Sequence, residues 1–153
     1  MSDIFNAIRS ESKVKVKEIL DSDRDLVDVK DDRGSTPLLL ASYYGFEEIT
    51  KLILEYKPNI DAQDASGNTA LMGVCFKGYT DIADLLIAHG ADINIKNFNE
   101  STALIFAATF AQKEILKLLV KHGADINAKD NRGFTAEMHA KNQGIDFFDT
   151  IKT

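Results

Sequence analysis

Apolar residues occur along this chain in short clusters separated by polar turns, and the clusters themselves repeat. The stretches GSTPLLLA, GNTALMGV, ESTALIFA and GFTAEMHA begin at Gly34, Gly67, Glu100 and Gly133, each 33 residues after the one before. The same interval separates further positions downstream, which include Ile49, Ile82 and Ile115 and the HGADIN segments at His89 and His122. A fixed interval of this length predicts a repeat architecture, in which similar units stack along one direction.

Each unit predicts two short helices. A threonine stands before the first apolar cluster, where its hydroxyl can accept a hydrogen bond from a free N–H of the helix start. These threonines are Thr36, Thr69, Thr102 and Thr135. In the second helix Ile82, Leu85 and Leu86 share one stripe, and Gly90 follows as a left-handed helix end. Because one such pair cannot bury its apolar faces alone, neighbouring pairs must stack, which predicts an all-α fold.

These motifs identify a family resemblance. The pattern D-x-x-G-x-T-A-L, a central glycine, I-x-x-L-L and G-A-D-I-N resembles the ankyrin repeat. The residues that carry it are Asp64, Gly67, Thr69, Ala70, Leu71, Gly78, Ile82, Leu85, Leu86, Gly90, Ala91, Asp92, Ile93 and Asn94. The resemblance implies an all-α ankyrin-repeat solenoid, an L-shaped stack of antiparallel helix pairs with projecting β-turn fingers.

The resemblance also implies one domain over residues 1–153. We expect an N-terminal capping repeat at 1–33, full repeats at 34–66, 67–99 and 100–132, and a C-terminal capping repeat at 133–153. Two departures from the family pattern predict local differences. Lys57-Pro58 replaces the Gly-Ala that ends the second helix, and Glu100 replaces the glycine of its finger, where a positive φ would strain it.

Composition narrows the classes of partner. A formal net charge of -6 argues against binding to nucleic acid or to an anionic membrane, since both depend on attraction to phosphate. The only cysteine is Cys75, so no intramolecular disulfide can form, and a cytoplasmic location is expected. No apolar run reaches the ~20 residues that span a bilayer, and the N-terminus has no secretory signal pattern. The size resembles that of small stand-alone bacterial ankyrin proteins.

Candidate catalytic chemistry is sparse. His89 and His122 each precede a helix-ending glycine, which suits a cation at a helix C-terminus, and two side chains do not make a zinc site. His139 has no Cys or His cluster beside it in the sequence, and Cys75 occupies a position that calls for a small buried residue. No phosphate-binding loop, GxSxG or HExxH motif occurs. We therefore expect no catalytic residue, cofactor or metal, and no enzyme.

Aromatic residues occupy positions that the repeat does not need for its core. Mapping the finger tips and the open edge of the first helix onto this sequence predicts a partner-binding concave face. It comprises Asp32, Arg33, Tyr43, Tyr44, Phe76, Lys77, Phe98, Asn99, Phe110, Arg132 and Phe134. The alternative for each ring is packing against a neighbouring finger or helix. Phe106, by contrast, aligns with Leu40 and is expected in the core.

Two functions remain open at this point. Rigid rings on a concave face favour a non-catalytic protein–protein interaction module, an adaptor or inhibitor that binds a protein partner. The lysines at Lys30, Lys96 and Lys129 recur beside this face and make it less negative than the whole molecule, unless they are only solvated. The alternative is a structural protein that self-associates through the same rings. Between a monomer and a homo-oligomer, we expect a monomer.

Overall fold

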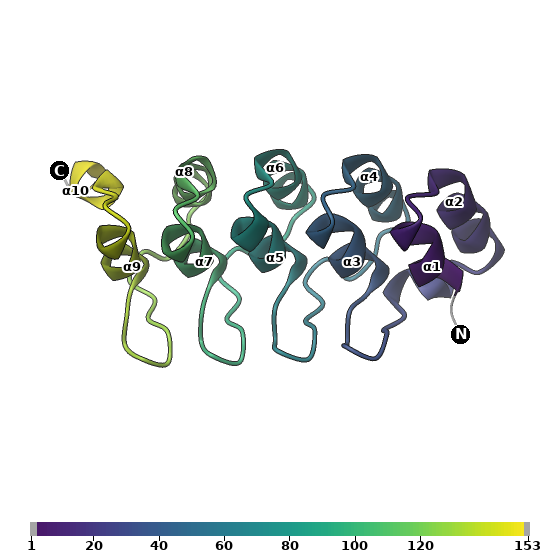
Figure 1. Cartoon of the computed structure of the whole chain (residues 1–153), viewed down its shortest axis with the longest axis horizontal. Coiled ribbons are helices and arrows are strands. Elements are labelled where there is room, and N and C mark those ends of the chain that lie inside the picture. Colours follow the sequence, from purple (N-terminus) through teal and green to yellow (C-terminus); the bar gives the residue numbers. More distant parts are fainter. Residues whose placement is uncertain (1–2, 152–153) are drawn as a thin grey trace.

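The computed structural model describes residues 3–151, with the side chains of residues 4–149. It is a row of helix pairs, in which the second helices form one layer, the first helices a second layer, and long loops project beyond them (Figure 1). The pairs are α1 (Asp3–Arg9) with α2 (Lys13–Ser22), α3 (Pro37–Tyr43) with α4 (Glu47–Glu55), α5 (Ala70–Lys77) with α6 (Thr80–Ala88), α7 (Ala103–Thr109) with α8 (Lys113–Lys121), and α9 (Ala136–Asn142) with α10 (Phe147–Ile151). A 3-10 helix, η1 (Arg24–Asp28), follows α2. The predicted all-α solenoid is confirmed.

The threonine caps fix where the first helices begin. The Oγ1 of Thr36 accepts a hydrogen bond from the N–H of Leu39, and the other three threonines do the same three residues ahead, at 3.2–3.3 Å. Helices α3, α5, α7 and α9 therefore start 33 residues apart. Each cap satisfies an N–H of its helix start, and in the three full repeats this N–H lies in a buried part of the stack.

The core lies between the two helix layers and continues through the row. Equivalent positions of successive units supply it, with exposed fractions of 0–2% for Leu38, Leu71 and Leu104 and for Ile53, Leu86 and Leu119. The N-terminal unit joins this core through Phe5, Ile8, Leu20 and Val27, while Ile19 is only partly buried. Phe148 and Ile145 close it at the other end.

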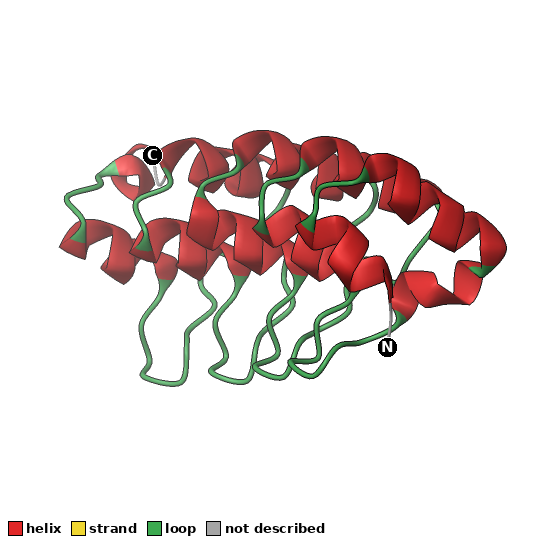
Figure 2. Cartoon of the chain, turned by 45° about the vertical axis from the view of Figure 1, so that its right-hand side comes forward, coloured by secondary structure: helices red, strands yellow, loops and turns green. Residues whose placement is uncertain are grey.

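The projecting loops are the predicted fingers (Figure 2). Their tips are residues 31–35, 64–68, 97–101 and 130–134, and each is a turn held by its first side chain. In the second finger, Oδ1 of Asp64 accepts hydrogen bonds from the N–H groups of Ser66 and Asn68, at 2.9 and 3.0 Å. The equivalent residues Asp31, Asn97 and Asp130 accept in the same pattern. A carboxylate or an amide oxygen serves equally well in this turn.

Backbone hydrogen bonds join each finger to the next. The N–H of Ala65 donates to the carbonyl of Arg33, that of Phe98 to Ser66, and that of Asn131 to Asn99, at 2.9–3.1 Å. Gly67 has a positive φ of 82°, and a Cβ there would lie 2.7 Å from the Phe98 nitrogen. Only glycine allows this approach at that position.

Side chains join the units at the base of the fingers. Lys30 Nζ donates to the carbonyl of Gln63, Gln63 Nε2 donates to that of Lys96, and Lys96 Nζ donates to that of Lys129, at 2.9–3.3 Å. Lys30 and Lys96, which the sequence suggested as charges beside the groove, therefore bind the next unit. They differ in this from merely solvated lysines.

The two sequence departures keep the repeat's backbone with local differences. Glu100 has a φ of 61°, so a non-glycine residue holds the left-handed conformation of its finger, as the sequence predicted. Lys57 also has a positive φ, of 53°. The N–H groups of Ala91 and Ala124 donate to helix carbonyls, whereas Pro58 has no N–H to donate, so this helix end loses one hydrogen bond.

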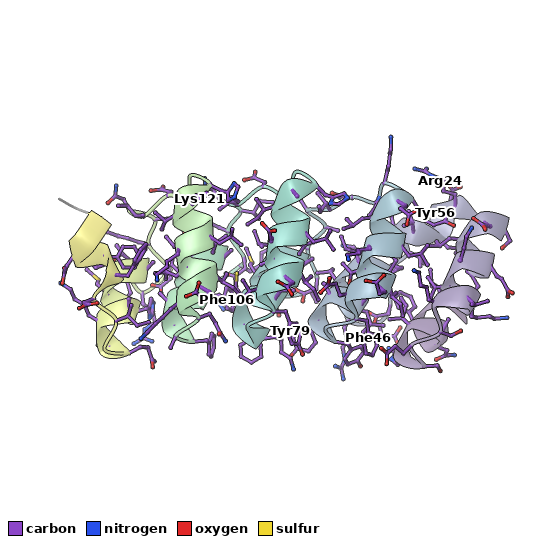
Figure 3. All side chains as sticks on the ribbon, turned by 90° about the horizontal axis from the view of Figure 1, so that it is seen from above. Arg24, Phe46, Tyr56, Tyr79, Phe106 and Lys121 are labelled. Atoms are coloured by element: carbon purple, nitrogen blue, oxygen red, sulfur yellow. The ribbon has the colours of Figure 1, made fainter. Side chains whose placement is uncertain are left out.

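The N-terminal unit is held to its neighbour at the C-terminal ends of the second helices. Arg24 and Tyr56 lie beside each other there (Figure 3), and the Arg24 guanidinium donates to the Tyr56 carbonyl at 2.6 Å. The Tyr56 hydroxyl donates to Asp21. The hydrogen bond from the Lys17 ammonium, together with this one from Tyr56, lowers the pKa of Asp21. These bonds position α2 against α4.

Candidate binding groove

Aromatic rings form a continuous row across three units on the finger side of the first helices. We call Tyr43, Tyr44, Phe76, Phe106 and Phe110 the aromatic row. Tyr43 lies parallel to Phe76 at 6.4 Å between centroids and meets Tyr44 edge-on, and Phe76 meets Phe110 edge-on at 4.7 Å. Phe110 stacks in turn on Phe106 at 6.3 Å. The structure thus brings four predicted binding-face residues together, with 39–43% of each side chain exposed.

Lys77, the next predicted residue, lies beside this row. Its Nζ sits 4.9 Å from the centroid of the Tyr43 ring and 6.0 Å from that of Tyr79. An ammonium at this distance from a ring is attracted to its negative face. Lys77 therefore already contacts the face of one ring of the row, that of Tyr43.

A cavity of about 330 Å³ opens between the rings of the row, and we call it the hollow. It is lined chiefly by Leu39, Tyr43, Asp64, Asn68, Met72, Gly73, Phe76, Phe106 and Phe110. Gly73 explains why space is left there. The equivalent residues of the flanking units are Leu40 and Phe106, so the middle unit lacks the side chain that its neighbours place at this position. A Cβ on Gly73 would meet only Tyr43, at 3.5 Å.

Phe106 differs from its sequence prediction. We expected it in the core because it aligns with Leu40, but both residues are only partly buried. Phe106 packs against the core on one side, and it lines the hollow and stacks on Phe110 on the other. The sequence signal that could have placed it at the groove is the variation Leu40, Gly73, Phe106 and His139 at one repeat position, because a core position keeps a more uniform size.

Asp32 and Arg33 lie at the N-terminal end of the groove. They line a wider cavity of about 780 Å³ together with Arg9, Tyr43 and Tyr44. Arg9 reaches the Asp31 carboxylate at 3.9 Å across this cavity. Since Tyr43 lines both this cavity and the hollow, the two form one groove.

Phe98 and Asn99 lie apart from the row. The Phe98 side chain is 69% exposed and covers Gly67 of the preceding finger, within 2.8 Å of where a Cβ would stand. It lines a separate cavity with Lys30, Asp61 and Gln63 rather than the hollow. Asn99 accepts from Asn131, with its carbonyl and its Oδ1. Both residues are finger-tip residues with contacts to a neighbouring finger.

Arg132 and Phe134 lie on the last finger and contact each other. The Arg132 guanidinium carbon is 4.8 Å from the Phe134 centroid, and Phe134 meets the His139 ring edge-on at 5.6 Å. His139 Nε2 lies 2.9 Å from Oδ2 of Asp130. Burial alone would raise the pKa of Asp130, but the His139 contact and the N–H groups of Phe134 and Arg132 outweigh it, so this pKa is lowered. No sequence motif predicts this pair, because its members lie nine residues apart.

The structure adds little to the other candidate chemistry. Cys75 is fully buried, and its burial raises the pKa of the thiol far above the usual range, which makes it unreactive. His89 caps α6 and its Nδ1 lies 2.9 Å from the Leu85 carbonyl. Among the described residues, no group of three His, Cys, Asp or Glu side chains could hold a metal ion. No helix within residues 3–151 is long and apolar enough to cross a bilayer.

Comparisons with known proteins agree with this fold. A family model described as ankyrin repeats (3 copies) matches residues 4–97, and one described as ankyrin repeats (many copies) matches residues 86–136. The chain belongs to the ankyrin-repeat family, as its sequence motifs predicted. Ankyrin repeats are generally protein–protein interaction modules and generally not enzymes.

One curated relative is ankyrin repeat domain-containing protein 49 of Drosophila melanogaster. It is 41% identical to this chain over 56 residues, which cover 37% of the chain and 26% of the relative. The chain thus matches about a quarter of the relative's length. The expected bacterial source remains an untested prediction.

Proposed function

We propose that this chain is a non-catalytic adaptor or inhibitor that binds a protein partner in its groove. The observation that carries the proposal is the aromatic row, in which Tyr43, Tyr44, Phe76 and Phe110 stay 39–43% exposed at positions that the helix stack does not need. Rings of this kind contribute large contact areas at little cost in side-chain entropy, which is why they dominate protein interfaces. Asp32, Arg33, Lys77 and the finger-tip residues would orient the partner around them.

A capture experiment from the native host tests this proposal. The wild-type chain and a Tyr44→Ala/Phe110→Ala variant serve as bait, with bound proteins identified by mass spectrometry. Loss of the two rings should lower recovery of the specific partner at least tenfold, since buried aromatic anchors contribute about 2 kcal/mol or more each. Val14→Ala is the matched control, because Val14 is 71% exposed on α2 and lines none of the cavities of the groove.

Unchanged recovery with the double variant would contradict the groove assignment. The alternative function, self-association through the same rings, predicts instead that the chain captures copies of itself. A cytoplasmic location also remains part of this proposal. It is supported by the single, buried Cys75 and by a net charge of -6 that favours neither nucleic acid nor anionic membranes.

A further inference from the structure

The hollow has a carboxylate at its edge that no side chain of the described residues pairs with. Oδ1 of Asp64 accepts two backbone N–H groups of its finger, and no hydrogen bond or ion pair reaches Oδ2 from residues 4–149. Asp64 lines the hollow beside Phe76 and Phe106. A carboxylate next to an apolar, aromatic-lined cavity favours an occupant that is cationic and partly apolar.

The equivalent residues of the other fingers all have a partner or carry no charge. Asp31 meets the Arg9 guanidinium at 3.9 Å, and Asp130 meets the His139 imidazole at 2.9 Å. In the third full unit the position is Asn97, a neutral side chain whose Nδ2 donates to Asn68 at 2.8 Å. Asp64 is therefore the exception among the four finger turns.

The last unit shows what the hollow lacks. His139 is the repeat equivalent of Gly73, and it supplies both the ring that fills this position and the nitrogen that meets Oδ2 of Asp130. Through Oδ1, Asp64 and Asp130 each accept from the two equivalent N–H groups of their own finger. Their second oxygens therefore take equivalent directions. Oδ2 of Asp64 therefore faces the space above Gly73, where the unit has no side chain of its own.

We propose that the hollow binds an arginine side chain of the protein partner, with its guanidinium on Oδ2 of Asp64 and its alkyl stem among the rings. This inference rests on the proposed function and specifies the partner's chemistry. Guanidinium is favoured over ammonium because it is planar, stacks on aromatic faces and is more weakly hydrated. The chain itself places the Arg132 guanidinium 4.8 Å from the Phe134 ring beside the Asp130–His139 pair. Lys77, the nearby cation of the row, does not line the hollow.

Small probes test this chemistry without knowledge of the partner. The ¹⁵N-labelled full chain is titrated with butylguanidinium, with butylammonium, and with butylurea, which is the neutral isostere of the guanidinium. Butylguanidinium should shift the amide signals of Gly73 and Phe76 saturably, with a Kd of roughly 1–10 mM, as expected for a fragment of this size. Butylurea should bind at least about fivefold more weakly, because it lacks the charge that pairs with the carboxylate.

Two substitutions separate the carboxylate from the cavity. Asp64→Asn should weaken butylguanidinium binding about fivefold or more, while the turn survives, because Asn97 holds the same turn in the next unit. Gly73→Leu should abolish binding by filling the hollow. This variant should fold as the wild type does, because Leu40 occupies the equivalent position. Asp84→Asn is the matched control, because Asp84 is an exposed aspartate on α6 that lines neither cavity of the groove, so this change should leave binding unchanged.

Specific outcomes would overturn the inference. Equal binding of butylurea and butylguanidinium, or an Asp64→Asn variant that binds as wild type, would exclude a cation site at Asp64. Tighter binding of butylammonium would exclude arginine in favour of lysine. If the double variant loses its partner while the probes do not bind, the groove function stands and the arginine inference fails. If the probes bind but the double variant recovers its partner as wild type does, the hollow is a guanidinium site and the proposed binding of the partner in the groove fails.

Discussion

Within residues 3–151, four residues other than glycine hold a positive φ: Glu11, Lys57, Glu100 and Ala111. Glu100 is the most informative, because the other three full or capping units place Gly34, Gly67 and Gly133 at its position. A side chain in the left-handed region is disfavoured by about 1–2 kcal/mol relative to the right-handed one. The finger nevertheless keeps its shape, because the Asn97 turn and the Asn131–Asn99 backbone bond hold it from both sides.

Removing this strain should stabilise the protein. Glu100→Gly is expected to raise the free energy of unfolding by about 0.5–1 kcal/mol, since part of the relief is offset by the greater freedom of glycine in the unfolded chain. Urea denaturation measures the change. Gly67→Ala is the opposite case, because its Cβ would lie 2.7 Å from the Phe98 nitrogen, and it should destabilise by more than about 1 kcal/mol. A destabilised Glu100→Gly would show that its left-handed backbone costs nothing.

The carboxylate of Asp130 should make the free energy of unfolding depend on pH in the acid range. Its pKa is lower in the folded chain than in the unfolded one, so it stabilises the fold above its unfolded pKa of about 3.9. This stabilisation is lost as the pH falls through the folded pKa. Asp130→Asn keeps the turn's acceptor oxygen, and it should lower the unfolding free energy by about 1 kcal/mol near pH 7. The difference from wild type should shrink as the pH falls below about 4.

Urea denaturation of both proteins across this pH range measures the effect. Asp32→Asn is the control, since Asp32 is exposed and makes no hydrogen bond or ion pair through its side chain with the described residues. A difference between wild type and Asp130→Asn that persists unchanged into acid would mean that the lost interaction does not involve the charge of Asp130.

At the scale of the helices and fingers, periodic features could be predicted from the sequence and unique ones could not. The threonine caps and the buried leucines recur every 33 residues, so four copies support each assignment. The hollow arises from one missing side chain, Gly73, and periodicity treats such a residue as noise. Phe106 was misplaced for the same reason, because alignment with Leu40 gives its direction but not the space left by the neighbouring unit.

Contacts across elements were the other feature that the sequence left out. Four rings of the aromatic row, all but Phe106, could be mapped one unit at a time, but the ring-to-ring contacts depend on the spacing of α3, α5 and α7. The separation of Phe98 from this row also depends on the third dimension, since its ring turns toward Gly67 of the preceding finger. The repeat boundaries and the binding-face residues remain predictions.

For the whole molecule we predict a monomer in solution. Both end units expose charged residues: α2 exposes Lys13, Lys15 and Lys17, and α9 carries the Glu137–Lys141 ion pair at 3.4 Å. Such end units prevent further stacking in repeat proteins. The net charge of -6 also opposes association of identical copies.

Sedimentation velocity over a wide range of protein concentration measures this. A single species with the mass of one chain is expected throughout. A dimer that forms at high concentration and disappears in the Tyr44→Ala/Phe110→Ala variant would instead support self-association through the aromatic row.

The bonds between fingers have a consequence for the length of the molecule. Lys30, Gln63 and Lys96 each donate to a carbonyl one unit ahead, and a backbone N–H of each later finger donates to the finger before it. A copy of residues 67–99 inserted after position 99 would therefore meet a matching donor and acceptor on both sides. We expect that this solenoid can be lengthened by inserting whole repeats, while its two capping units keep their present structure.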